Sequence, residues 1–151
     1  MGIRIWTDGG CSGNPGPGGW AFVMDNGGNK IIAENYGGEN ATTNNRMELY
    51  AVVSALNYIH ENERTREDIT LFTDSQYVQK GMSEWIKKWK LNGWKSAGNK
   101  PVKNKDLWLE LDKLSAGINI DWQWVKGHAG NEFNERCDAM TQLAILNITG
   151  R

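Results

Sequence analysis

The most constraining feature of the sequence is a repeated pattern in which an apolar run ends in an aspartate. Residues 3–8 alternate β-branched or aromatic residues with polar ones, which predicts a strand that ends at Asp8 before paired glycines. Residues 69–74 form a second such run, ending in Asp74. A helix between two strands makes them parallel, so both aspartates are expected at the carboxyl edge of one sheet.

The helix between these strands is predicted over residues 45–59, with Thr43 or Asn44 as its N-cap. Its apolar face is formed by Ala51, Val52, Ala55 and Ile59. These positions lie three, four, seven and eleven residues after Glu48, which puts this carboxylate on the same face. Two interpretations remain open: an acid that favours the helix dipole, or a functional group.

The other segments complete an α/β pattern. Strands are predicted at 20–24, 30–36 and 118–125, a hairpin turn at 25–28, a polar loop at 37–41, and helices at 82–91, 103–115 and 131–147. The first three strands should be sequential and antiparallel. In the fifth strand, Trp122 and Trp124 are expected to be core or helix contacts. The whole chain, residues 1–151, is expected to be one domain.

Composition excludes several classes of protein. The net charge of −1 rules out a globally basic nucleic-acid binder. Two cysteines are too few for a disulfide scaffold, which indicates a reducing compartment. The chain has neither an apolar run long enough to span a membrane nor a signal-peptide core. We therefore expect a cytoplasmic protein with no membrane partner. We also expect a monomer.

Two segments suggest contact with a nucleic-acid backbone. Residues 9–19 are rich in glycine, so their amide groups are open to a phosphodiester, although such a composition taken alone favours a simple turn between two strands. Residues 80–105 carry eight lysines and only one acid, Glu84, among three tryptophans. We interpret the lysines as a basic arm and the tryptophans as packing residues.

Four carboxylates, Asp8, Glu48, Asp74 and Asp138, can converge if the sheet forms as predicted. They would repel one another in a shielded site unless hard divalent cations were bound. Carboxylate and water ligands suit Mg²⁺ or Mn²⁺. An acidic site beside a basic arm indicates phosphodiester hydrolysis with two metal ions about 4 Å apart. His128, in a glycine-bracketed loop, titrates near neutrality and is free to move.

Five motifs resemble the bacterial-type ribonuclease HI family. They are Thr7–Gly10, Gly13–Gly19, Thr42–Glu48, Thr73–Val78, and Lys126–Gly130 continuing to Asn134–Asp138. They occur in the family's order over nearly the whole chain. The resemblance implies a ribonuclease H-like α/β fold: a five-stranded mixed sheet of order 3-2-1-4-5 with strand 2 antiparallel, flanked by helices. It also implies cleavage of the RNA strand of RNA–DNA hybrids, giving 5′-phosphate and 3′-hydroxyl ends.

The resemblance also implies residue roles. Asp8, Glu48, Asp74 and Asp138 would be metal ligands, with Glu48 near the ribose 2′-OH and His128 as a proton shuttle or an aid to product release. Substrate contacts are implied for Gly10, Cys11, Asn14, Thr43, Asn44, Asn45, Gln76, Trp85, Lys87 and Lys88. Thr43 would grip a DNA phosphate. Ala41 stands where relatives often carry a basic residue, which implies a weaker grip.

Two alternatives remain at this level. One is another polynucleotidyl transferase of the same fold, such as a junction resolvase or a polymerase-associated nuclease domain. The other is a non-catalytic hybrid-binding module, which would need the lysines but not the four carboxylates. With no hybrid-binding segment before Met1, low processivity is expected.

Overall fold

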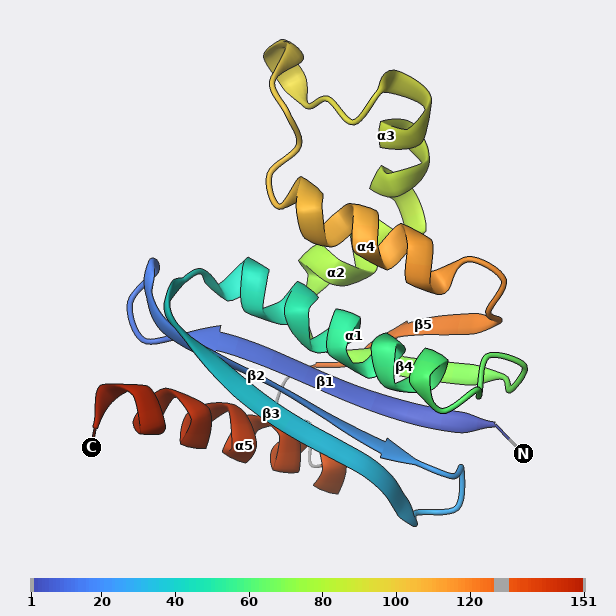
Figure 1. Ribbon diagram of the computed structural model, residues 1–151, viewed down its shortest axis with the longest axis vertical. Coiled ribbons are helices and arrows are strands. Elements are labelled where there is room, and N and C mark those ends of the chain that lie inside the picture. Colours follow the sequence, from blue (N-terminus) through green and yellow to red (C-terminus); the bar gives the residue numbers. More distant parts are fainter. Residues whose placement is uncertain (1, 127–130, 151) are drawn as a thin grey trace.

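The computed structural model describes residues 2–126 and 131–150, and its centre is a mixed β-sheet (Figure 1). The strands are β1 (Ile3–Cys11), β2 (Gly16–Asp25), β3 (Ile31–Thr42), β4 (Ile69–Thr73) and β5 (Ile120–Trp124). They lie in the order β3-β2-β1-β4-β5. β1 pairs antiparallel with β2 and parallel with β4, and β5 is parallel to β4. This confirms the predicted topology.

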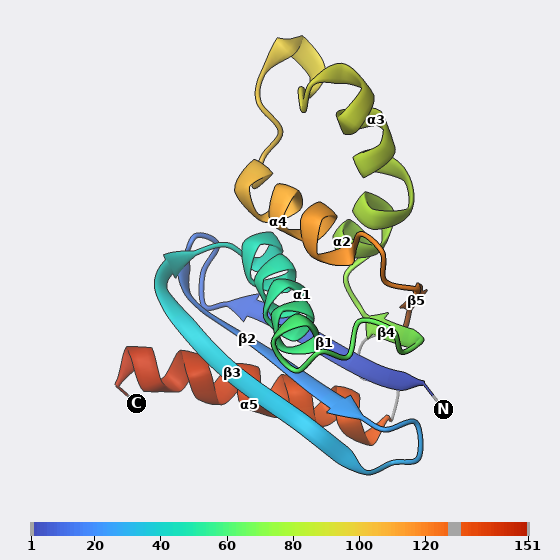
Figure 2. The same ribbon diagram turned by 45° about the vertical axis from the view of Figure 1, so that its right-hand side comes forward.

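Helices flank the sheet on both faces. They are α1 (Asn44–Glu61), α2 (Gln76–Lys80), the π-helical turn η1 (Gly81–Trp85), α3 (Ile86–Asn92), the short 3₁₀ turn η2 (Ala97–Asn99), α4 (Lys105–Ser115) and α5 (Glu132–Thr149). α1 covers one face and α5 the other, while α4 packs on α1 (Figures 1 and 2). The helix predicted at 82–91 is part of a longer helical run from α2 through α3.

Two apolar cores lie on opposite faces of β1, as strand alternation requires. Ile3 and Ile5 point to the α1 side and join the larger core, which contains the fully buried Trp108 of α4. Trp6 points to the α5 side and packs with Phe133 and Cys137. Within the described ranges, no helix has both the length and the apolar character that crossing a membrane demands.

Three strands are longer than the sequence predicts. β1 continues through Gly9 and Gly10 to Cys11, β2 begins at Gly16, and β3 runs through the segment predicted as a polar loop, residues 37–41. The reason is a row of glycines that pair across the three strands: Gly10 with Gly19, and Gly19 with Gly38. A Cβ on Gly38 would lie 2.6 Å from Ile148 Cδ1 of α5. These glycines therefore let α5 lie close to the sheet rather than ending the strands.

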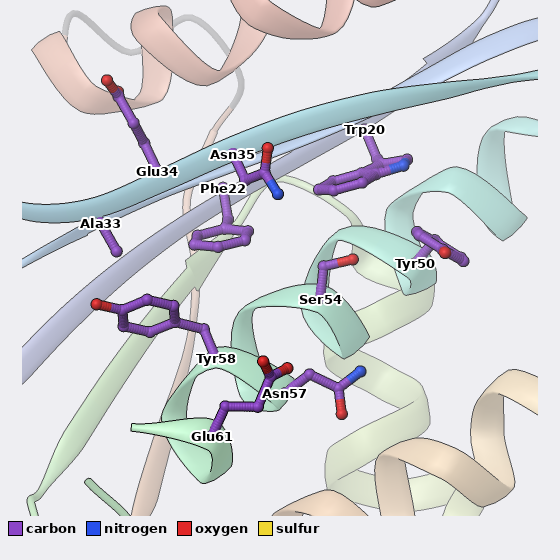
Figure 3. Close-up of a pocket in the computed structure, with 10 residues that line it drawn as sticks. All are labelled: Trp20, Phe22, Ala33, Glu34, Asn35, Tyr50, Ser54, Asn57, Tyr58 and Glu61. Carbon is purple, nitrogen blue, oxygen red and sulfur yellow. The ribbon is translucent and has the colours of Figure 1, made fainter. Parts of the chain in front are cut away.

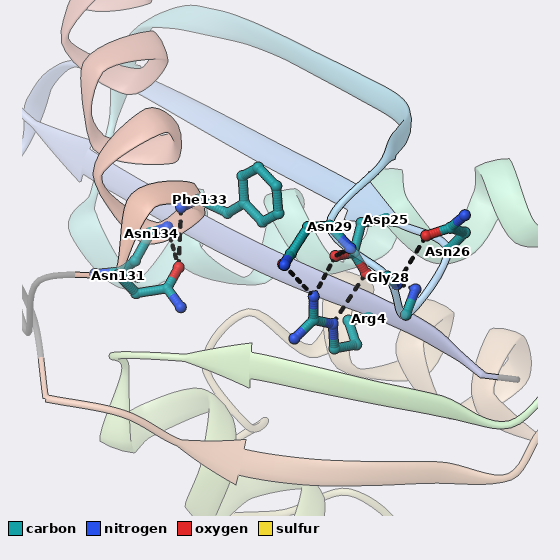
Figure 4. Close-up of polar contacts among 9 residues, drawn as sticks. Arg4, Asp25, Asn26, Gly28, Asn29, Asn131, Phe133 and Asn134 are labelled. Atoms are coloured by element: carbon teal, nitrogen blue, oxygen red, sulfur yellow. Dashed lines mark hydrogen bonds and ion pairs between the residues drawn. The ribbon is translucent and has the colours of Figure 1, made fainter.

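The predicted hairpin turn at 25–28 is confirmed, and a buried ion pair anchors it (Figure 4). Asp25 is fully buried and accepts hydrogen bonds from the Arg4 guanidinium, with 3.1 Å from Nε to Oδ1. It also accepts the amide N–H of Gly27 at 2.9 Å and that of Asn29 at 3.2 Å. The carboxylate thus ties the turn to the first strand.

A pocket of about 460 Å³ lies between α1 and the neighbouring surface of β2 and β3 (Figure 3). Aromatic side chains of Trp20, Phe22, Tyr50 and Tyr58 line it, together with polar groups such as Asn57. None of the four candidate carboxylates lines this pocket. The chemistry expected from the sequence therefore belongs to another part of the molecule.

Candidate active site

The site is built where β1 and β4 separate. Their parallel pairing ends at the pair Thr7 and Thr73, and Asp8 and Asp74 follow directly on the two chains. The sequence predicted that the strand ends at Asp8, but β1 continues beyond it and goes on pairing with β2. The carboxylates meet at this edge because β1 has lost its β4 neighbour at that point, and not because β1 stops.

Gly9 lets α1 bring the third carboxylate to this edge. A Cβ on Gly9 would lie 2.5 Å from the Glu48 nitrogen and 2.6 Å from the Met47 carbonyl oxygen. Real Cβ atoms do not make such contacts, so the backbone of α1 rests directly on the strand. Thr43, whose side chain accepts the Arg46 amide, caps the start of this helix as predicted. Glu48, in the second turn, therefore reaches the aspartates.

Asp8, Glu48 and Asp74 form one compact group. Each offers a carboxylate oxygen, and the three oxygens lie within 4.8 Å of one another. Burial raises the pKa of Asp8 to about 7, and the charges of Asp74 and Asp138 add to the effect. Burial also raises the pKa of Glu48 well above its ordinary range, and the charges of Asp8 and Asp74 raise it further. The group therefore holds its negative charge at a cost.

This group fits a divalent cation. Glu48 Oε1 is buried and has no hydrogen-bond partner among the described residues, which is unusual for a carboxylate oxygen. The donor set is oxygen only, the set preferred by hard cations such as Mg²⁺, Mn²⁺ and Ca²⁺. A cation would supply the missing partner and remove the repulsion among the three charges. The structure thus has an acidic triad that could bind metal.

The other two predicted catalytic residues are Asp138 and His128. Asp138 is half-buried on α5, and its charge acts on Asp8, so it borders the triad without belonging to the group of three. His128 lies outside the described residues. Its role as a proton shuttle stays a prediction.

Four of the predicted substrate contacts line one cleft of about 470 Å³. They are Asn14, Thr43, Asn44 and Asn45. Asn14 Oδ1 accepts the Asn44 amide at 3.2 Å, which fixes the glycine-rich turn against the start of α1. Lys103, a lysine of the predicted basic arm, and Asn104 complete the lining, although neither was named as an individual substrate contact. No local pattern distinguished them from the other polar residues of the basic arm.

Other predicted contacts lie elsewhere. Gly10 and Cys11 are the last two residues of β1, and the Cys11 thiol donates to the Thr42 carbonyl oxygen at 3.2 Å. Gln76 begins α2 and is exposed. In the basic arm, Lys87 is exposed on α3. A further cleft of about 560 Å³ lies there, lined by Trp85, Lys88, Trp89, Asn92, Lys95, Ser96 and Ala97.

Trp124 does not belong to the core, which was one of the two positions predicted for it. Its side chain is 44% exposed, whereas Trp122 packs against the core as expected. Trp124 Nε1 donates to the Asp74 carbonyl oxygen at 3.1 Å, so β5 supports the segment that carries a site carboxylate. Alternation along the strand indicates which face a residue occupies. It does not indicate whether another segment covers that face.

This combination defines a class of protein: α/β proteins of the ribonuclease H-like fold with an acidic group at the split between two parallel strands. The sequence matches the family model for RNase H over residues 2–145. It is 56% identical to the ribonuclease H of Treponema denticola, covering 93% of this chain and 94% of that protein. The ribonuclease H of Hyphomonas neptunium is 52% identical, covering 99% and 95%.

Solved structures of RNase H proteins have the same fold as this chain. LC9-RNase H1, described as a type 1 RNase H with the type 2 active-site motif, superposes with a TM-score of 0.83 at 33% identity, covering 96% of this chain and 72% of that one. LC11-RNase H1, solved in complex with RNA/DNA hybrid, gives 0.76 at 22% identity, covering 97% and 99%, and supports the fold alone. The chain belongs to the RNase H family and is an enzyme of that family. A non-catalytic binding module is therefore set aside.

Proposed function

We propose that the protein hydrolyses the RNA strand of RNA–DNA hybrids at the Asp8, Glu48 and Asp74 group, giving 5′-phosphate and 3′-hydroxyl ends. The observation that carries this proposal is the cluster of three carboxylate oxygens within 4.8 Å in a chain of the RNase H family. The buried Glu48 Oε1 adds support, because it has no hydrogen-bond partner among the described residues.

In this proposal, Asp8, Glu48, Asp74 and Asp138 hold two Mg²⁺ ions, and Mn²⁺ can replace them. When bound, the ions lower the pKa of the attacking water and neutralise charge on the phosphate. Glu48 also lies by the ribose 2′-OH, the group by which a site distinguishes RNA from DNA. His128 moves a proton or helps the product leave.

The rest of the chain positions the substrate. The cleft of Asn14, Thr43, Asn44 and Asn45 offers amide and hydroxyl groups suited to sugar and phosphate oxygens. Trp85, Lys87 and Lys88 lie on the basic arm and contact the backbone of the DNA strand. Gly10, Cys11 and Gln76 contact the hybrid beside the carboxylates. We further propose that residues 1–151 form a single domain and act in the cytoplasm as a monomer.

The test is a hybrid duplex labelled on the RNA strand or on the DNA strand, incubated with Mg²⁺ or with EDTA. We expect that only the RNA strand is cleaved and that cleavage occurs with Mg²⁺ but not with EDTA. The products should carry 5′-phosphate and 3′-hydroxyl ends. Duplex DNA and duplex RNA of the same sequence are the matched substrates and should stay intact. Cleavage of the DNA strand, or equal cleavage with the chelator, would contradict the proposal.

A further inference from the structure

Thr141, on α5, is a buried hydroxyl that the function above does not use. The residue is 1% exposed, and among the described residues its Oγ1 has no hydrogen-bond partner within normal limits. Leaving a buried hydroxyl unpaired costs about 1–3 kcal/mol. Valine has the same shape and would avoid that cost, so packing alone does not account for threonine here.

The glycine row of the sheet fixes where Thr141 lies. Gly10 and Gly19 face each other across β1 and β2, and a Cβ on Gly19 would lie 2.7 Å from the Thr141 carbonyl oxygen. A Cβ on Gly10 would lie 3.9 Å from Thr141 Cγ2. The next pair on this face of the sheet is Asp8 with Ala21. Thr141 therefore lies over the pair Gly10 and Gly19, which neighbours the pair that contains Asp8.

The helix face agrees with this placement. Thr141 comes three residues after Asp138, so both side chains project from one face of α5. Asp138 lies near enough to Asp8 for its charge to act on that carboxyl, so this face of α5 is turned toward Asp8. Asp8 is therefore the nearest acceptor on this face for a hydroxyl that has no partner among the described residues.

We propose that Thr141 is a positioning residue whose hydroxyl donates to the ionised Asp8 carboxylate and turns it toward Glu48 and Asp74. The hydroxyl holds one carboxylate oxygen and so limits the rotamers of Asp8 before any cation binds. The consequence for metal affinity rests on the proposed function, whereas the orientation of Asp8 does not.

Two substitutions separate the hydroxyl from the methyl group. Thr141→Val keeps the shape and removes the donor, and Thr141→Ser keeps the donor and removes the methyl. In the metal-free protein, the ¹³Cγ resonance of Asp8 should move in Thr141→Val and stay in Thr141→Ser. By calorimetry with Mn²⁺ alone, Thr141→Val should bind about 10-fold more weakly, the scale found for groups that orient metal ligands, and Thr141→Ser should bind like the wild type.

Thr7→Val is the matched control. Thr7 also has a buried hydroxyl without a partner in the described part of the chain, but strand alternation puts it on the α1 side of β1, with Ile3 and Ile5. It should change neither the Asp8 resonance nor Mn²⁺ affinity. The proposal is overturned if Thr141→Val leaves the Asp8 resonance unchanged, if Thr141→Ser matches Thr141→Val, or if Thr7→Val weakens Mn²⁺ equally. Loss of hybrid cleavage or metal binding by the wild type would instead refute the proposed function, and the resonance would still decide the role of Thr141.

Discussion

Asp8 titrates at a pKa of about 7 in the folded chain because of its burial and the neighbouring charges of Asp74 and Asp138, against an ordinary value of 3.8. Between these values the unfolded chain has lost the proton that the folded chain keeps. Ionisation of Asp8 therefore works against folding as the pH rises through this window, and the full penalty remains above it.

We predict that Asp8→Asn stabilises the metal-free protein while it abolishes hybrid cleavage. The gain in free energy of unfolding should be absent below pH 3.8, grow as the pH rises to about 7 and stay constant above, with an upper bound of about 4 kcal/mol. Urea titrations in EDTA at a series of pH values measure it. A less stable variant at pH 8 would mean that Asp8 is needed for folding.

The pKa of Asp25 is shifted in the opposite direction from that of Asp8. Although burial opposes its charge, the hydrogen bonds from Arg4, Gly27 and Asn29 hold the pKa of this carboxyl below its usual range. Its contribution to stability is therefore complete above the pKa of an unfolded aspartate and is lost as the pH falls through the lower folded value.

We predict that Asp25→Asn lowers the free energy of unfolding at pH 7 by about 1.5–3 kcal/mol, the range for hydrogen bonds to charged groups. The difference from the wild type should shrink as the solution is acidified, because the wild type then loses the same charge. Denaturant titrations at neutral and acid pH give both numbers. The half-exposed pair Arg64 and Glu67 is the control, and Glu67→Gln should cost about 0–1 kcal/mol.

At the scale of elements, the site depends on how closely α1 rests on β1. Glu48 reaches Asp8 and Asp74 only because Gly9 presents no side chain to the backbone of Met47 and Glu48. A glycine that looks like the end of a strand is thus the contact surface for a helix.

We predict that Gly9→Ala pushes α1 away from the strand, lowers stability by about 1–3 kcal/mol, as overpacking usually does, and reduces Mn²⁺ affinity. Thermal unfolding and calorimetry check the two effects together. Gly28→Ala, at an exposed turn where the Cβ would contact only the Asn26 side chain at 3.3 Å, is the control and should leave metal affinity intact. Normal Mn²⁺ binding by Gly9→Ala would disprove this account of how α1 is placed.

At the scale of the whole molecule, the basic arm forms a lobe beyond α1, away from the sheet (Figure 2). Trp108 joins it to the core: its ring is fully buried, its Nε1 donates to the Tyr77 hydroxyl at 3.1 Å, and Gly81 lies against the ring. The tryptophans of the arm pack mainly on one another and on Trp108, as predicted, which leaves the lysines on the outside.

We predict that replacing Lys87 and Lys88 with glutamine raises KM for hybrid cleavage with little change in kcat, because the arm would bind substrate equally in ground and transition states. The slope of log affinity against log salt should fall by up to about 2, one for each lost phosphate contact. Lys30→Gln, at the exposed turn between β2 and β3, is the control. A salt slope unchanged from the wild type would mean that these lysines do not contact phosphate.

The sequence alone determined the parallel placement of β1 and β4 and, with it, the common edge of Asp8 and Asp74. Both follow from local periodicity and from the strand–helix–strand pattern, which need only neighbouring residues. The sheet order came from the family resemblance, and the pattern of α1 put Glu48 on the apolar face without deciding its role. The sequence also placed Thr43 at the start of α1 and the hairpin turn at Asp25.

Only the tertiary structure decided which glycines continue a strand and which side chains are exposed. The glycines of β1 and β3 looked like strand ends, yet they continue the strands because α5 and α1 lie against them. Trp124 alternates like a core residue but is exposed, and Thr141 is buried beside Asp8. These outcomes depend on which distant segment covers each residue, and such packing leaves no periodic pattern in the sequence.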